Sequence, residues 1–190
     1  MNRTQLLTGA IPAEIRRAGP QDQDAIREFL DGLSVQTRYL RFFAGFSPTS
    51  PGMLRILTGG SGDVLVAWVD GMVVGHVMAA YVPGPGPGGG GPLAHVGIVV
   101  ADAWQGRGIG SALLDALAGV VRAHGASGLV MDVLRENARM LGMIARRWPT
   151  ASYDPAGDCV AITTPVTGTA RRLVPDRTMR AFGRPLTAGV

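Results

Sequence analysis

The chain of 190 residues has no lysine, a single cysteine and no long apolar run. Without lysine it cannot contain the Gly-Lys-Ser/Thr end of a Walker phosphate-binding loop. The lone Cys159 excludes an internal disulfide, and we expect it to be a buried strand residue. No apolar run reaches the roughly 20 residues of a membrane span, and residues 1–5 lead into no signal-peptide core. These absences predict a cytoplasmic protein without a membrane partner.

Other chemistries lack their residue patterns as well. The three histidines, His76, His95 and His124, have no metal-ligand spacing with one another or with Cys159, so no metal is expected. The Gly-x-Ser-x-Gly nucleophile elbow does not occur, and the glycines of residues 105–111 run Gly-x-Gly-x-Gly and not as the Gly-x-Gly-x-x-Gly dinucleotide fingerprint. The net charge is +4 and every basic side chain is an arginine. These arginines are scattered, without a recognition helix or an aromatic-basic platform, which favours an anionic small ligand over nucleic acid.

Length and patterning predict one α/β domain with one core. A helix begins at residues 21–22 and carries Ile26, Phe29 and Leu30 on one face. An Asp-Gly pair at 70–71 predicts a hairpin turn. Residues 83–92 are almost all Gly and Pro and predict a flexible loop, and the chain beyond 165 predicts a loosely held tail. Strands are expected at 13–18, 64–69, 72–79, 93–100, 129–133 and 159–164, and further helices at 33–43, 108–124 and 137–147.

Residues 105–111 are the most informative segment. They lie between the β-branched run 96–100 and an apolar helical pattern at 112–117. A glycine-rich turn at a helix start leaves backbone N–H groups unpaired, and the helix dipole adds partial positive charge there. Glycines let a pyrophosphate approach the backbone, and an arginine can add a charged contact. The segment therefore predicts a phosphate site made of Gln105, Gly106, Arg107, Gly108, Ile109, Gly110 and Ser111.

This segment resembles the Gln/Arg-x-x-Gly-x-Gly/Ala loop of the GCN5-related N-acetyltransferases (GNAT family), which bind the pyrophosphate of acetyl-CoA. The order of elements over residues 13–164 resembles that fold too. The resemblance implies a mixed central sheet in which the acetyl-CoA strand and the next strand splay apart. It places a GNAT domain at 13–164, after an extension at 1–12 and before the tail at 165–190.

Two local motifs narrow the resemblance to the bacterial protein lysine acetyltransferases. Residues 33–43 resemble the "Leu-Ser-x-x-Ser-x-Tyr-Leu-Arg-Phe-Phe" helix of these enzymes. Residues 133–141 resemble their "Val-Leu-x-Glu-Asn-x-x-Met" segment, where a strand leads into a helix. They imply a protein lysine as acceptor. The alternative for the first motif is plain core packing of Tyr39, Phe42 and Phe43, and neither motif fixes the substrate.

The resemblance also implies how acetyl-CoA is held as cosubstrate. Exposed backbone groups of residues 98–100 would pair with the pantetheine arm, and one N–H there would polarise the thioester carbonyl. Asn137 would bind the pantetheine or a nearby water, and Met140 and Ile144 would offer apolar contacts. Beyond the phosphate loop, the predicted cofactor residues are Ile98, Val99, Val100, Asn137 and Met140.

The catalytic base departs from the family pattern. Counting back from Gln105 puts His95 where the lysine acetyltransferases have a glutamate. An imidazole accepts a proton near neutral pH, so His95 is our candidate base. The alternative is a strand histidine that faces solvent or packs on a neighbour, and Asp132 and Glu136 are the other candidates. The family's tyrosine, a general acid, is replaced by Ile144 in this chain.

We therefore predict an acetyl-CoA-dependent N-acetyltransferase that acts on protein lysine. Two alternatives stay open: an enzyme that acetylates a small-molecule amine, and a non-catalytic domain that binds acyl-CoA as a sensor. Loss of the glutamate favours the second alternative. The sequence leaves open whether the protein forms a homodimer.

Overall fold

The computed structural model describes residues 4–8, 11–43, 50–60, 62–83 and 90–166. Most of the predicted Gly/Pro loop, and the predicted tail beyond residue 166, lie outside these ranges.

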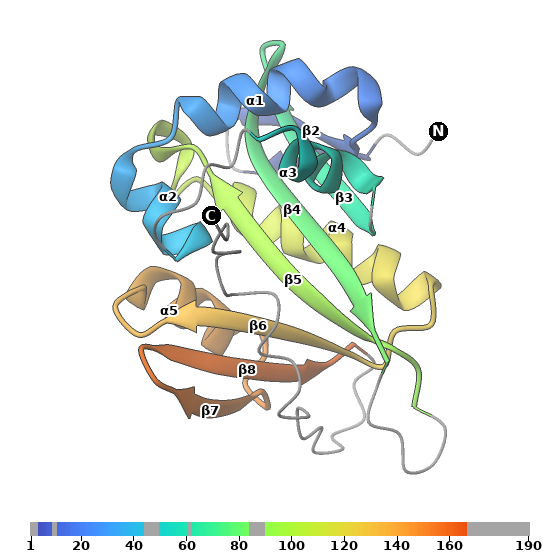
Figure 1. Cartoon of the computed structure of the whole chain (residues 1–190), viewed down its shortest axis with the longest axis vertical. Coiled ribbons are helices and arrows are strands. Elements are labelled where there is room, and N and C mark those ends of the chain that lie inside the picture. Colours follow the sequence, from blue (N-terminus) through green and yellow to red (C-terminus); the bar gives the residue numbers. More distant parts are fainter. Residues whose placement is uncertain (1–3, 9–10, 44–49, 61, 84–89, 167–190) are drawn as a thin grey trace, which may run out of the picture.

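A single mixed sheet runs through the molecule in the order β1-β2-β3-β4-β5-β6-β8-β7 (Figure 1). Neighbouring strands are antiparallel except β5 and β6, which are parallel. The strands are β1 (Thr4–Thr8), β2 (Ile11–Arg17), β3 (Asp63–Val69), β4 (Met72–Val82), β5 (Leu93–Val100), β6 (Gly128–Leu134), β7 (Ser152–Ala156) and β8 (Cys159–Pro165).

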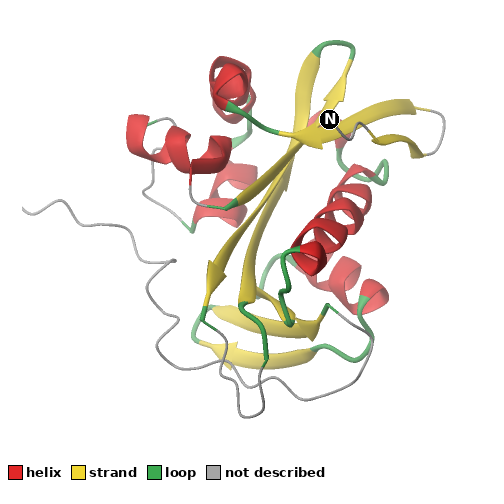
Figure 2. Cartoon of the chain, turned by 90° about the vertical axis from the view of Figure 1, so that its right-hand side faces the viewer, coloured by secondary structure: helices red, strands yellow, loops and turns green. Residues whose placement is uncertain are grey.

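Helices cover both faces of this sheet (Figure 2). They are α1 (Gln23–Asp31), α2 (Val35–Phe42), α3 (Pro51–Arg55), α4 (Ile109–Ala123) and α5 (Ala138–Arg147). Helix α4 packs on the face that carries Ile15, Leu65 and Val96, whereas α1 and α3 pack on the opposite face, which carries Val66 and Val99. Because side chains alternate along a strand, the central strands β3, β4 and β5 contribute to both cores.

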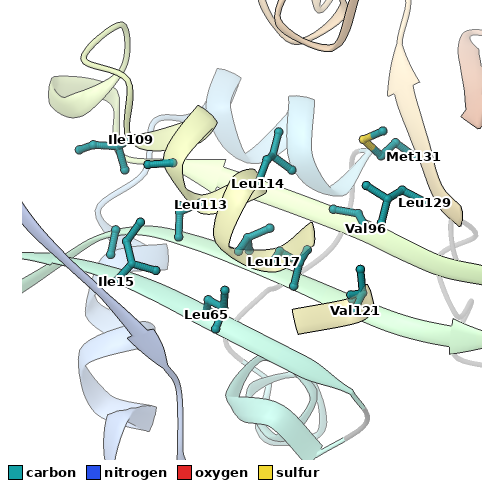
Figure 3. Packing of buried hydrophobic residues seen from close by; sticks show 14 of the residues in the cluster. Ile15, Leu65, Val96, Ile109, Leu113, Leu114, Leu117, Val121, Leu129 and Met131 are labelled. Atoms are coloured by element: carbon teal, nitrogen blue, oxygen red, sulfur yellow. The ribbon is translucent and has the colours of Figure 1, made fainter. Parts of the chain in front are cut away.

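Helix α4 fixes the larger core (Figure 3). Its Leu113, Leu117 and Val121 recur at helical spacing and are almost completely buried. Burial of one such leucine stabilises the fold by about 1.5–3 kcal/mol. The helix lies so close to β4 that a Cβ on Gly75 would be 2.9 Å from Cδ1 of Leu113. Glycine at position 75 therefore permits this approach of helix to sheet.

The parallel pair β5–β6 is short. Only Leu93, Ala94 and His95 of β5 pair with β6, opposite Gly128, Leu129 and Val130. Beyond His95, β5 continues to Val100 beside β4 only, and β6 continues beside β8 (Figure 1). This divergence confirms the predicted splay, and the mixed sheet with helices confirms the predicted fold class.

Among the strands and α-helices, β1, α3 and β7 were not predicted. Strand β1 lies in the segment assigned to an N-terminal extension and pairs with β2. Strand β7 contains Pro155 and is mostly exposed, which is typical of an edge strand and gives no alternating apolar pattern.

The prediction that Cys159 is buried was wrong. As the first residue of β8 it is half-buried, and its partial burial raises the pKa of its thiol.

Candidate active site

The predicted phosphate loop forms the start of α4. Gly106 and Gly108 have φ angles of 78° and 86°, a left-handed region that glycine adopts without strain. Ala112 N–H donates to the Gly108 carbonyl at 3.0 Å, which closes the first helical turn. The N–H groups of Ile109 to Ser111 precede that bond and have no acceptor within the helix. This arrangement fits a pyrophosphate, because unpaired donors meet the positive end of a 15-residue helix.

Gln105 connects the loop to three other elements. Its Nε2 donates to the Val100 carbonyl at 3.1 Å and to Oγ1 of Thr37 at 3.2 Å. Its Oε1 accepts a hydrogen bond of 2.6 Å from Nη1 of Arg139. One amide thus joins the end of β5, helix α2 and helix α5. Sequence reasoning missed Arg139, an exposed cation beside the loop, because only the three-dimensional structure brings α5 there.

Apolar side chains of β5 and α5 converge at the start of α4. A Cβ on Gly110 would lie 3.6 Å from Sδ of Met143, 3.7 Å from Cγ2 of Val100 and 3.9 Å from Cδ1 of Ile98. The ends of β5 and α4 and the side of α5 therefore meet beside the splay. Val99 points to the opposite face and is buried in the other core.

The remaining cofactor candidates have their own local contacts. Asn137 is the N-cap of α5, and its Oδ1 accepts from Met140 N–H at 3.1 Å. Met140 is partly buried against the main core. Arg107 places its guanidinium 5.0 Å from the centre of the Trp104 ring. These residues lie on the same side of the splay as the predicted phosphate loop. Their contacts with acetyl-CoA stay predictions.

Asp102 holds α2 against the turn that precedes the loop. Its carboxylate accepts from the backbone N–H and Oγ of Ser34, at 3.0 and 2.7 Å, and from Oγ1 of Thr37 at 2.7 Å. Desolvation would raise the pKa of Asp102, but these hydrogen bonds together hold it below 3.8. The carboxylate therefore fixes the position of α2 relative to the end of β5.

His95 is the last β5 residue paired with β6, so it lies where the two strands begin to separate. Its Nε2 is 3.0 Å from Oδ2 of Asp132, and the two side chains are 19% and 33% exposed. The structure thus brings two of the three candidate bases together. Glu136 is exposed in the turn after β6, where its charge raises the pKa of the Tyr39 phenol on α2.

His95 and Asp132 are arranged as a general base and the carboxylate that orients it. An ionised Asp132 accepts the Nε2 hydrogen, which leaves the lone pair of a neutral imidazole on Nδ1. The same carboxylate stabilises the imidazolium that forms when Nδ1 takes a proton. His95 can therefore accept a proton at the start of the splay.

Some site types are absent from the described part of the chain. No group of three or more His, Cys, Asp or Glu side chains in the described ranges could hold a metal ion. Among the helices that the structure describes, none is long and apolar enough to span a membrane.

Family comparison agrees with this geometry. Residues 33–147 match the model of the acetyltransferase (GNAT) family, a span that includes α2, the splay, the loop and α5. The chain therefore belongs to the GNAT family and is an N-acetyltransferase, and acetyl-CoA binding follows from membership. Comparison with curated protein sequences gives no significant match.

Solved structures show the same fold. The GNAT domain of PAT from S. lividans has a TM-score of 0.75 at 24% identity, over 86% of this chain and 96% of that one. An N-acetyltransferase from Staphylococcus aureus Mu50 has a TM-score of 0.62 at 18% identity, over 82% and 99%. PaiA N-acetyltransferase from Thermoplasma acidophilum, solved with coenzyme A, has a TM-score of 0.62 at 14% identity, over 80% and 98%.

Proposed function

We propose that this N-acetyltransferase acetylates the side-chain amine of a protein lysine, with His95 as general base and Asp132 as the residue that orients it. The observation that carries the proposal is the 3.0 Å contact between His95 and Asp132 at the start of the splay. It supplies a proton acceptor where the family's usual glutamate is absent.

The reaction needs little beyond positioning and one proton transfer, because a thioester is already activated. The amine nitrogen attacks the acetyl carbonyl carbon, a C–N bond forms and the C–S bond breaks. The amine proton goes to Nδ1 of His95, directly or through a water, and CoA leaves as the thiolate. One backbone N–H within residues 98–100, a stretch that has no β6 partner, would stabilise the developing oxyanion by about 3 kcal/mol.

Helix α2 supports a macromolecular acceptor. Val35 is 77% exposed and Tyr39 is 36% exposed, and their spacing of four residues places them on one face of the helix. Glu136 adds negative charge next to Tyr39. An exposed apolar face beside an acidic group suits the surface around a lysine, whose ammonium group is cationic and whose neighbours are partly apolar. A small free amine needs no such surface.

The test compares native protein with His95→Ala. Each is incubated with acetyl-CoA and a cell lysate, followed by acetyl-lysine proteomics and small-molecule mass spectrometry. We expect acetylated proteins with the native chain and 10²- to 10⁴-fold less with the variant. Turnover of free amines without protein acetylation would favour the small-molecule alternative. Tight acetyl-CoA binding with no product would favour a sensor.

A further inference from the structure

Arg41 directs its charge to the same part of β5 as the candidate base. It lies in the last turn of α2, and a Cβ built on Gly97 would overlap the Cζ and both terminal nitrogens of Arg41. Gly97 is two residues beyond His95, so both residues face the same side of the sheet. Glycine at position 97 therefore leaves the space that the guanidinium occupies.

This charge has no counter-charge in the described structure. Nε of Arg41 is shielded from solvent and has no hydrogen-bond partner. No carboxylate of the described residues forms an ion pair with Arg41, and desolvation lowers the pKa of its guanidinium to about 10. Arg41 is therefore still a cation at neutral pH. Its aromatic neighbour is Phe42, whose ring centre is 4.8 Å from Cζ.

The nearby histidine adds no second positive charge and offers no counter-charge. His76 on β4 is buried, and its Nε2 donates to the Leu57 carbonyl at 2.9 Å. Burial, together with the charge of Arg41, lowers the pKa of His76 to about 4, so this imidazole is neutral. A partly buried cation whose Nε is shielded from water and unpaired costs free energy unless an anion joins it.

We propose that Arg41 binds a carboxylate carried by one of the two substrates, at the acyl end of the splay; this inference rests on the proposed transferase function. A guanidinium forms two parallel hydrogen bonds with a carboxylate, which suits a planar anion better than a point charge. The CoA phosphates are not the expected anion, because α4, whose N-terminus would hold them, packs on the opposite face of the sheet from Gly97. The carboxylate belongs either to a dicarboxylic acyl group on CoA or to the acceptor amine.

Matched ligand pairs separate the two sources. The donor arm compares succinyl-CoA with the neutral butyryl-CoA. The acceptor arm compares Nα-acetyl-lysine with Nα-acetyl-lysinamide, and α-amino acids with their amides, each titrated into the protein–CoA complex. Native protein should bind the carboxylate member of one arm more tightly. That arm identifies which substrate carries the anion.

Substitutions then test the residue itself. Arg41→Gln should raise the Kd and KM of the carboxylate member roughly 10- to 100-fold, the range of a charged hydrogen bond, and those of the neutral member less than about twofold. Arg41→Lys should retain part of the preference. Arg38→Gln, on the same helix, is the control and should behave as native protein.

Gly97→Ala is an independent variant, because its methyl group displaces the guanidinium without changing any charge. It keeps the proposal testable if Arg41→Gln does not fold. Equal effects on both members of every pair, in folded protein, would overturn the proposal. The binding measurements need no turnover. Loss of carboxylate preference in a protein that acetylates nothing would therefore support the anion site and contradict the proposed function.

Discussion

The side chain of Asp132 contacts that of His95 where β5 and β6 begin to separate. The strand partner of His95 is Val130, and Asp132 lies two residues further along β6 on the same face. Just where the backbone ladder between β5 and β6 ends, this side-chain contact of 3.0 Å replaces it. The contact joins the separating strands and gives the imidazole a fixed direction.

Asp132→Asn should impair catalysis while leaving cofactor binding intact. The amide keeps the size of the side chain but cannot stabilise an imidazolium by charge. We expect kcat to fall at least about tenfold, with an unchanged acetyl-CoA Kd by calorimetry. Asp154→Asn is the matched control, because Asp154 and Asp132 share Ala161 as strand partner and Asp154 is exposed. Native kcat in Asp132→Asn would show that the contact is only structural.

The pH dependence should identify the base. If His95 accepts the amine proton, activity rises with pH as the imidazole loses its own proton. His95→Ala should remove this ascending limb and lower kcat 10²- to 10⁴-fold, whereas His95→Glu restores the family's residue and should recover activity. Steady-state rates between pH 5 and 9 check this. An ascending limb that is the same in native protein and His95→Ala would exclude His95.

Gly108→Asp should abolish acetyl-CoA binding. The substitution puts a side chain and a negative charge among the N–H groups at the start of α4. Gly125→Asp is the matched control at the other end of the helix. Its φ of 78° is close to the 86° of Gly108, so both variants carry similar backbone strain. We expect calorimetry to show native affinity for Gly125→Asp alone, and equal affinities would refute the phosphate site.

Sequence patterning predicted the elements that bury an apolar face. Helix α4, the β3–β4 hairpin and β5 were expected from periodicity and from the Asp-Gly turn, and the structure confirms them within a few residues. The glycine-rich turn also predicted the phosphate loop. In the structure, Gly106 and Gly108 adopt the left-handed angles that such a turn needs. Each of these signals is local in sequence.

Contacts between distant residues gave no such signal. Arg139 is 34 residues from Gln105, and His95 is 37 residues from Asp132. No signal in the sequence around Arg41 indicates that its guanidinium lies against Gly97. The site depends on how α2, β5 and α5 pack, and no short sequence window contains that information.

A buried ion cluster at the far end of α4 should make stability depend on pH. Asp63 is 3% exposed and accepts hydrogen bonds from Arg17, Tyr81 and His124, the last at 2.7 Å. Burial would raise the pKa of Asp63, but the three hydrogen bonds outweigh it and hold the pKa below 3.8. The ionised carboxylate therefore stabilises the fold above that pH. This contribution is lost as the pH falls through the lowered, folded-state pKa.

Asp63→Asn tests this cluster. The amide leaves Arg17 and His124 without their charged partner, so we expect a loss of about 2 kcal/mol at pH 7 and a melting temperature lower by roughly 4–8 °C. Between pH 7 and pH 2.5, the difference from native protein should shrink once the pH falls below 3.8, because the native carboxylate then becomes protonated too. Thermal melts across this range measure it, with the exposed Asp31→Asn as control. A difference that persists undiminished at pH 2.5 would show that hydrogen-bond geometry, and not the charge of Asp63, stabilises this end of the sheet.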